Sequence, residues 1–331
     1  MTPTVTLSHI EAARARIAEH IATTPLRLSP ALSARRPAPV YLKLETRQTT
    51  GSFKVRGATS AVMALDDAAR SRGLVTASTG NHGRALAHAA EQAGVRAVIC
   101  MSALVPANKV EAVRALGAEV RIVGRSQDDA QVEVERLVRD EGLTEIPPFD
   151  HPDVIAGQGT IGLEIVEALP EVACVLVPLS GGGLAAGVAA AVKGLRPAAR
   201  MIGVSMARGA AMQASLAAGK PVMVDELETL ADSLGGGIGL ANAHSFSLCA
   251  ALLDGVVLLS EDEIAAGIRH THEVEGEVVE GAGAVGIAAL LAGKVDAEGP
   301  VVAILSGRNI DANLHAEIVS GRWSAPSERA A

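Results

Sequence analysis

Between residues 73 and 143, short apolar runs alternate with longer amphipathic ones. The apolar runs GLVTAS, VRAVICM and EVRIVG have the length of buried strands, and each is followed by a run that favours a helix. Gly94 and Gly117 suit the ends of the first two helices, and Ser126 suits the start of the third. Strands that alternate with helices pair in parallel through crossovers, so we expect an open α/β sheet.

A second series of this kind follows the proline-rich stretch LTEIPPFDHPD at 143–153. Its apolar runs are VACVLVPL, MIGVSM, GVVLLS and GPVVAILS. A chain of 331 residues exceeds the usual size of one compact unit, so we predict two doubly wound open-sheet domains joined at the proline-rich stretch. Residues 1–70 and 151–331 are expected to form a large domain, and residues 71–150 a small one.

The composition argues against several kinds of partner. The net charge is −8, no Lys/Arg-rich run occurs and aromatic residues are 2% of the chain, so we expect neither nucleic acid nor a membrane as partner. The uncharged run 172–192 has the length of a membrane span, but Pro178 and SGGGL within it favour a strand, a loop and a helix. The cysteines lie far apart in apolar runs, which predicts buried thiols in a reducing, cytoplasmic compartment: Cys100, Cys174 and Cys249.

Four loops concentrate the residues that could perform chemistry. Three follow predicted strands, namely ASTGNHG at 77–83, PLSGGGLAAG at 178–187 and LSGRN at 305–309. The fourth, GSFKVRGA at 51–58, leads into a predicted helix. Because ligands of open α/β sheets bind at the carboxyl ends of the strands, the first three are expected to lie near a ligand.

Two of these loops suit anions. Consecutive glycines in SGGGL let backbone N–H groups close around a phosphate at a helix start, although a plain tight turn is the alternative. No GxxxxGK[ST] stretch occurs, so this is not a nucleotide P-loop. STGNHG offers hydroxyl, amide and N–H groups that suit a carboxylate or a phenolate oxygen, with an ordinary capping turn as the alternative.

Lys54 has two interpretations. It lies at a predicted helix start beside Phe53, with Arg56 two places on, and a lysine in such a position is commonly a solvated surface residue. A lysine that forms a Schiff base instead needs a lowered pKa, which an apolar wall and a neighbouring cation both favour. The local sequence does not decide between the two.

Three competing patterns are weaker. GAGAVG at 281–286 matches the dinucleotide fingerprint, but the next predicted strand ends at Ser306 without the acid that an NAD site needs. His270, His272 and Glu273 point in different directions on the helix expected there, and HExxH is absent. No GxSxG nucleophile elbow occurs, because GVSMA lacks the closing glycine.

Taken together, SFKVRGA, STGNHG, SGGGL and SGRN resemble, in order and spacing, the serine/threonine dehydratase family of pyridoxal-phosphate enzymes, whose fold is fold type II (tryptophan synthase β-like). HPDVIAGQGTIGLEI and VVEGAGAVG resemble it as well, and the resemblance extends from about residue 7 to residue 318. MSALVPANKVEAVRALGAEVRIVGRSQDDAQ, GVSMARGAAM and LADSLGGGIGL are most similar to the dehydratase of hydroxyectoine-utilisation clusters. In this family GAGAVG becomes a structural turn near the cofactor domain.

The resemblance implies a site for pyridoxal 5′-phosphate within the large domain. Lys54 matches the catalytic lysine that forms the Schiff base, Asn81 the residue that binds the phenolic oxygen and Ser306 the residue that faces the ring nitrogen. The implied cofactor-binding residues are Phe53, Lys54, Asn81, Ser180, Gly181, Gly182, Gly183, Leu184 and Ser306. The loop implied to hold the substrate carboxylate consists of Ser78, Thr79, Gly80 and His82.

The chain also departs from the family pattern. Ser205 and Ala211 replace the acids that bind a divalent cation in many relatives, so we expect no metal. SGRN replaces the commoner SGGN and places Arg308 near the ring, where it could change the preference for substrate charge. Ser180 opens the phosphate loop where glycine is usual.

The resemblance implies a lyase. A hydroxyl at Ser306 leaves the ring nitrogen largely neutral, which favours prompt loss of a β-substituent over transamination. We expect Lys54 to remove the Cα proton of a β-hydroxy amino acid or a hydroxyectoine-derived amino acid, with loss of water and then ammonia. An amino-acid racemase, a general L-threonine/L-serine ammonia-lyase, a β-replacement synthase and a non-catalytic binding module stay open as alternatives. The family also implies a homodimer.

Overall fold

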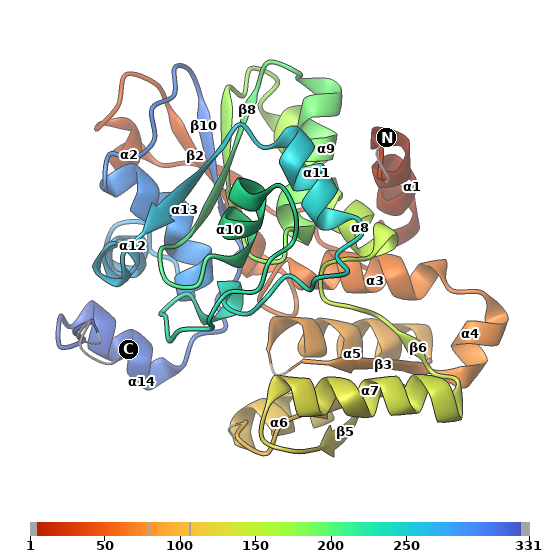
Figure 1. Cartoon of the computed structure of the whole chain (residues 1–331). Helices are drawn as coiled ribbons and strands as arrows, with labels where there is room; N and C mark the ends of the chain where they lie inside the picture. The colour runs from red at the N-terminus through yellow and green to blue at the C-terminus, as the bar shows by residue number, and fades with distance from the viewer. Residues whose placement is uncertain (1–4, 79, 106, 326–331) are drawn as a thin grey trace.

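The computed structural model describes residues 5–78, 80–105 and 107–325, whose strands form two sheets (Figure 1). The six-stranded sheet has the order β1 (Leu26–Leu28), β2 (Val40–Leu44), β10 (Val301–Leu305), β7 (Cys174–Pro178), β8 (Arg200–Met206) and β9 (Gly255–Leu259). The four-stranded sheet has the order β5 (Glu119–Ile122), β4 (Ala97–Met101), β3 (Leu74–Ala77) and β6 (Thr144–Glu145). All neighbouring strands are parallel except β1 and β2, so the predicted open parallel architecture is confirmed.

Sequence reasoning placed most of these strands but not all of them. The three runs between residues 73 and 143 form β3, β4 and β5, as predicted. β1 and β2 were not predicted, and β6 lies inside the stretch interpreted as a plain junction. The strands of each sheet fall within the residue ranges predicted for the two domains, whose boundaries stay a prediction.

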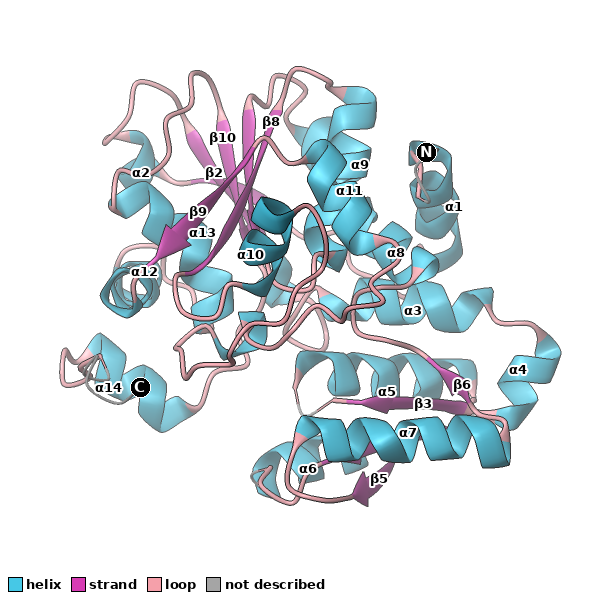
Figure 2. Ribbon diagram, in the orientation of Figure 1, coloured by secondary structure: helices cyan, strands magenta, loops and turns pink. Residues whose placement is uncertain are grey.

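Helices cover both faces of the larger sheet (Figure 2). The alternation of side chains along β7 shows this: Val175 and Val177 belong to one apolar core, and Cys174 and Leu176 to the other. The helices are α1 (Leu7–Ile17), α2 (Pro30–Ser33), η1 (Glu45–Arg47), α3 (Lys54–Ala64), α4 (Asp67–Arg72), α5 (Asn81–Ala93), α6 (Ala107–Arg114), α7 (Gln127–Glu141), α8 (Pro152–Ala168), α9 (Gly183–Leu195), α10 (Ala211–Ala218), η2 (Asp232–Leu234), α11 (Ser245–Leu252), α12 (Glu261–Glu273), α13 (Gly281–Leu291) and α14 (Ala312–Val319).

Local signals set several helix ends. Gly94 closes α5 with a φ of 64°, a left-handed conformation that favours glycine. Ser126 caps α7 in a capping box with Asp129. The resemblance implied that GAGAVG is a structural turn, and this is wrong. These residues begin helix α13, whose small side chains pack tightly in the core.

Helices α3 and α8 cross at glycines. A Cβ on Gly157 would lie 2.6 Å from the Arg56 carbonyl oxygen and 2.7 Å from the Cα of Gly57. The two backbones therefore approach more closely than any side chain would allow. Since α3 also packs on α5, this crossing joins the helices of the two sheets next to Lys54.

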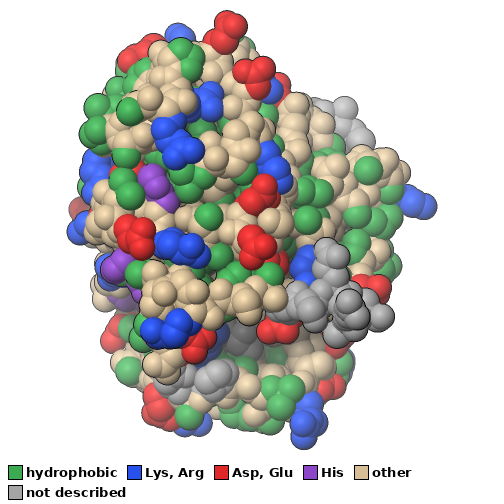
Figure 3. All heavy atoms as spheres, turned by 90° about the vertical axis from the view of Figure 1, so that its left-hand side faces the viewer, with side chains coloured by type: hydrophobic (Ala, Val, Ile, Leu, Met, Phe, Trp, Pro, Cys, Tyr) green, Lys and Arg blue, Asp and Glu red, His purple; other side chains and the backbone are tan. Residues whose placement is uncertain are grey.

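The expected lack of a nucleic-acid or membrane partner stays a prediction. On the face shown in Figure 3, acidic and basic side chains are interspersed. Within the described residues, no helix is both long and apolar enough to cross a membrane. The three cysteines are buried and unpaired, so that part of the prediction is confirmed.

We expect Gly157→Ala to lower the free energy of unfolding by roughly 1–3 kcal/mol, because its methyl group overlaps backbone atoms that cannot move aside. Gly194→Ala is the matched helical control, since its Cβ would meet only the Leu7 side chain, at 3.3 Å. Urea unfolding of both variants tests the prediction, and equal effects would contradict it.

Candidate functional site

The chain places Lys54 at the carboxyl end of β10. The Phe53 N–H donates to the Ser306 carbonyl oxygen at 2.9 Å, and Ser52 forms an isolated β-bridge with Gly307. The first turn of α3 is thereby attached to the loop that follows the strand. This is the edge of the sheet where the sequence predicted a ligand.

The Lys54 amine is withdrawn from water. Its Nζ donates to the Pro148 carbonyl oxygen at 2.8 Å and lies 5.3 Å from the centre of the Phe53 ring. Burial lowers the pKa of Lys54 to about 8, against the opposing negative charge of Glu280. The interpretation of Lys54 as a solvated surface lysine is therefore wrong.

The predicted influence of Arg56 on Lys54 is also wrong. The lowered pKa of Lys54 has burial as its main cause, and Arg56 makes no appreciable contribution. The Arg56 guanidinium instead binds the carboxylates of Glu45 and Glu164, which compensate its charge. Of the two causes expected from the sequence, only the apolar surroundings operate.

The glycine loop opens α9, as the sequence predicted. Gly182 has a φ of 89°, and no side chain caps the amino end of this helix. A Cβ on Gly181 or Gly183 would overlap Phe149. Leu184 packs in the core, whereas Ser180 is partly exposed at the end of the strand. Backbone N–H groups at an uncapped helix start are suitable ligands for a phosphate.

The stretch interpreted as a junction forms a wall of the site. Pro148 accepts the hydrogen bond from Lys54, and Phe149 lies against the glycine loop. The Asp150 carboxylate accepts hydrogen bonds from the N–H groups of residues 243–245, and Ser245 Oγ donates to the Gly181 carbonyl oxygen at 2.6 Å. Sequence reasoning missed this role, because prolines between two domains indicate only a break in regular structure.

The loop before α5 approaches the same wall. His82 Nε2 lies 2.8 Å from the Ile146 carbonyl oxygen, and burial and the charge of Lys54 lower the pKa of His82 to about 3. The Gly83 N–H donates to Ser78 Oγ at 3.0 Å, and Gly80 precedes the helix. Thr79 lies outside the described residues.

Asn81, the first residue of α5, connects this helix to the loop that follows β10. Its side-chain amide donates to Glu280 Oε1 at 2.7 Å, and its oxygen accepts a hydrogen bond from Asn309 Nδ2 at 2.6 Å. The Asn309 N–H also donates to Glu280 Oε2. Both ends of the amide are thus engaged within the protein, and its predicted contact with a phenolic oxygen stays a prediction.

Glu280 is the titratable group that sequence reasoning missed. Burial, with the nearby charge of Asp232, raises its pKa to about 7, although Asn81 and Asn309 donate hydrogen bonds to it. It stands directly before α13, in the stretch VVEGAGAVG, which was noticed for its glycines. An acid that precedes a helix is commonly a surface cap, so nothing local indicated its burial.

Ser306 is buried, with 2% of its surface exposed, at the end of β10. Among the described residues, no three His, Cys, Asp or Glu side chains lie together as a metal site would require. Within this part of the chain, no other group of side chains therefore replaces the metal-binding acids that are missing at Ser205 and Ala211.

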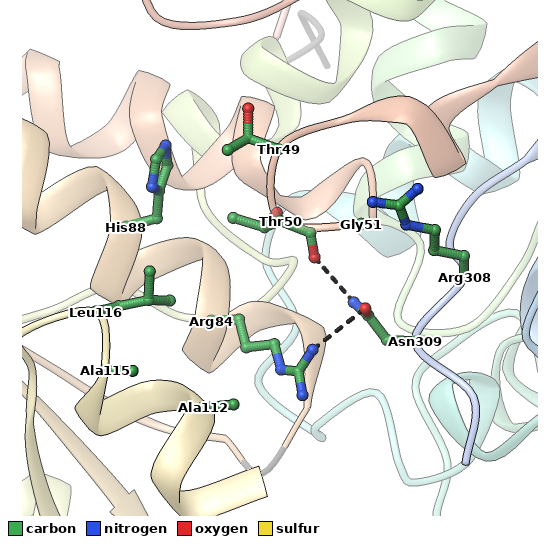
Figure 4. Close-up of a pocket in the computed structure, with 10 residues that line it drawn as sticks. All are labelled: Thr49, Thr50, Gly51, Arg84, His88, Ala112, Ala115, Leu116, Arg308 and Asn309. Atoms are coloured by element: carbon green, nitrogen blue, oxygen red, sulfur yellow. Dashed lines mark hydrogen bonds between the residues drawn. The ribbon is translucent and has the colours of Figure 1, made fainter. Parts of the chain in front are cut away.

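A pocket of about 310 Å³ lies beside the loop that precedes Lys54 (Figure 4). Its lining comprises Thr49, Thr50, Gly51, Arg84, His88, Ala112, Ala115, Leu116, Arg308 and Asn309. Asn309 bonds there to the Thr50 carbonyl oxygen and to Arg84. Neither Lys54 nor the glycine loop is part of this lining, and the predicted place of Arg308 near a cofactor ring stays a prediction.

We expect Glu280→Gln to change how stability depends on pH. The raised pKa means that the folded carboxyl holds its proton up to about pH 7, whereas the unfolded one loses it near 4.5. The stability that this proton provides is full below pH 4.5 and is lost as the pH rises through 7. Glutamine does not titrate. As the pH is raised from 5 to 8, the free energy of unfolding of Glu280→Gln should therefore rise by roughly 2–3 kcal/mol relative to that of the unchanged protein.

Urea unfolding of both proteins at pH 5 and at pH 8 measures this difference. Glu91→Gln, an exposed change on α5, is the control that should show no such trend. A difference between the Glu280→Gln and unchanged proteins that does not vary with pH would contradict the prediction.

Comparisons with known proteins match the chain to one family. Residues 17–307 match the family described as pyridoxal-phosphate dependent enzyme. A provisionally named threonine dehydratase of Sinorhizobium fredii is 64% identical over 325 residues, covering 98% of each chain. The L-threonine ammonia-lyase of Thermotoga maritima is 41% identical over 317 residues, covering 96% of this chain and 78% of that protein.

Among solved structures, maize serine racemase superposes with a TM-score of 0.90 at 32% identity, covering 96% of this chain and 98% of that one. The predicted fold, that of fold-type II enzymes, is confirmed by this match together with the two parallel sheets. On both the family match and the identities, the chain belongs to the pyridoxal-phosphate dependent enzymes.

Proposed function

We propose that this protein is a lyase that removes water and then ammonia from a β-hydroxy amino acid. One observation carries the proposal: the Lys54 amine is withdrawn from water, with a pKa of about 8, at the strand edge next to an uncapped glycine loop. A purely binding protein of this fold needs no such amine, because binding alone requires no covalent bond to a carbonyl.

The residues present fit pyridoxal 5′-phosphate. Lys54 would hold its aldehyde carbon, the N–H groups of residues 180–184 its phosphate, and Ser306 its ring nitrogen, with Phe53 and Asn81 beside it. The support is that no side chain caps the start of α9 and that Gly182 has a φ of 89° there. When bound, the cofactor withdraws electrons from the Cα of an attached amino acid.

The side chains of this protein would supply the proton transfers. The Lys54 amine, largely free of its proton above pH 8, is the base for the Cα proton. The hydrogen bond to the Pro148 carbonyl oxygen orients this amine. Ser78, Thr79, Gly80 and His82 would hold the substrate carboxylate at the start of α5, where the helix dipole favours an anion.

The substrate proposed in first place is a hydroxyectoine-derived amino acid. Its support is the sequence of the stretches at 101–131, 203–212 and 230–240, which are most similar to dehydratases of hydroxyectoine-utilisation clusters. L-threonine and L-serine are the alternatives, and the named activity of the Thermotoga maritima relative supports L-threonine. A cytoplasmic homodimer acting on this small molecule completes the proposal.

Racemisation is the second candidate activity. It is favoured by the close superposition on maize serine racemase. A racemase needs an acid or base on each face of the substrate. Thr79 lies in sequence where the second group would be required, and a threonine there weakens this candidate. Chiral analysis distinguishes the activities, because a racemase yields the D-amino acid without a keto acid.

We expect Lys54→Ala to abolish the absorbance band of the lysine-bound cofactor and to lower kcat by about 10³-fold or more. The assay incubates the protein with L-threonine, L-serine and hydroxyectoine-derived amino acids, followed by detection of keto acid. Lys220→Ala, a change at an exposed lysine, is the control. A Lys54→Ala protein that retains the band would refute the proposed role of Lys54.

The rate at which the cofactor-free protein gains this band should depend on pH. Because the free amine is the reacting form, the rate should rise about tenfold per pH unit below pH 8 and level off above it. An ordinary lysine, with a pKa of 10.5, would instead show a rate that still rises at pH 10. Stopped-flow absorbance on pyridoxal phosphate addition distinguishes the two profiles.

A further inference from the structure

Arg56 lies two residues after Lys54 on α3, and its side chain is 1% exposed. Residues two apart on a helix point in nearly opposite directions, so the two cations of one turn enter different surroundings. The Lys54 amine reaches the Pro148 carbonyl oxygen, whereas the Arg56 guanidinium enters the interior of the large-sheet layer.

Six hydrogen bonds hold the guanidinium, the longest of them from Nη2 to the Ala22 carbonyl oxygen at 3.4 Å. Its Nε and Nη2 bind the two oxygens of Glu45 at 2.8 and 2.9 Å. Its Nη1 and Nη2 bind the two oxygens of Glu164 at 2.6 and 2.9 Å, and Nη1 also binds Thr160 Oγ1 at 3.0 Å. Two forked ion pairs restrain the direction of the arginine as well as its distance from each carboxylate.

A second cation completes this group, which we name the Arg56 cluster: Lys43, Glu45, Arg56 and Glu164. Lys43 Nζ binds Glu164 Oε2 at 2.5 Å and the Thr24 carbonyl oxygen at 2.7 Å. Two positive and two negative groups balance, so the cluster carries no net charge. This explains why Arg56 does not shift the pKa of Lys54.

The cluster connects α3 to the rigid parts of the large-sheet layer. Lys43 belongs to β2, Glu45 to η1 and Glu164 to α8. A buried ion group of this kind commonly adds little stability over apolar side chains of the same volume, because removing the charges from water is costly. What the two forks provide, and apolar packing does not, is a fixed orientation of the helix that carries them.

The first turn of α3 is therefore restrained on two sides. On one side the Phe53 N–H bonds to the Ser306 carbonyl oxygen. On the other side, the Arg56 cluster holds the helix at the place where Gly157 allows α8 to contact the Arg56 backbone. Lys54 lies between these two restraints.

We propose that Arg56 is a positioning residue: through its forks to Glu45 and Glu164 it fixes the first turn of α3, and thereby the direction of the Lys54 amine. This inference rests on the proposed covalent role of Lys54. Arg56 itself touches none of the reacting atoms. Its contribution is the alignment of an amine that has to reach both the cofactor carbon and the substrate Cα proton.

The test compares Arg56→Lys with the unchanged holoenzyme. Lysine keeps the charge and loses both forks, so we expect kcat to fall at least tenfold while KM changes less than threefold. The absorbance band of the lysine-bound cofactor should become weaker at saturating cofactor. Glu164→Gln removes one charge of the second fork and should give a smaller loss of the same kind, which keeps the test usable if Arg56→Lys does not fold.

Ile165→Val is the stability control, since Ile165 is buried in α8 outside the Arg56 cluster. All assays are run well below the lowest Tm of the set. The inference is overturned if Arg56→Lys or Glu164→Gln, when folded, retains both kcat within twofold and an unchanged band, or if Ile165→Val loses kcat equally for an equal loss of Tm. Lys54→Ala, assayed beside these variants, separates this inference from the proposed function. If the Lys54→Ala protein keeps the absorbance band, the proposed function itself is refuted.

Discussion

The removal of the Lys54 amine from water is the constraint on which the rest of the site depends. An ammonium group loses hydration when it is buried, so the pKa of Lys54 falls to about 8 and about a tenth of it is free amine at pH 7. The same burial requires a hydrogen-bond partner, which the Pro148 carbonyl oxygen provides. A solvated lysine would have neither the reactivity nor the fixed direction that this position gives.

The stretch around Phe149 connects parts of the site that lie far apart in the chain. It contacts Lys54 through Pro148, the glycine loop through Phe149 and the start of α11 through Asp150. His82 reaches the same stretch from the smaller sheet's layer. The apparent junction is thus the surface against which both sheets' layers place their functional groups.

Two buried charges near Lys54 are compensated in different ways. Arg56 has two carboxylates, so its charge is cancelled within a few ångströms. Glu280 accepts hydrogen bonds from amide and N–H donors, and the positive charge of Lys109 acts on it only weakly, so burial raises its pKa to about 7. Full ion pairing makes Arg56 a mechanical restraint, whereas partial compensation leaves Glu280 able to titrate in the range in which the protein would act.

The sequence by itself determined the parallel α/β architecture, the glycine loop before α9 and the position of Lys54 at a helix start, because periodicity, glycine and capping residues act within a few positions of the chain. It did not determine that β2 lies inside the sheet, that Glu280 is buried or that Arg56 turns away from Lys54. Those features depend on segments that meet only after folding: hydration is lost, and an ion pair is gained, according to what the rest of the chain brings within a few ångströms of each group.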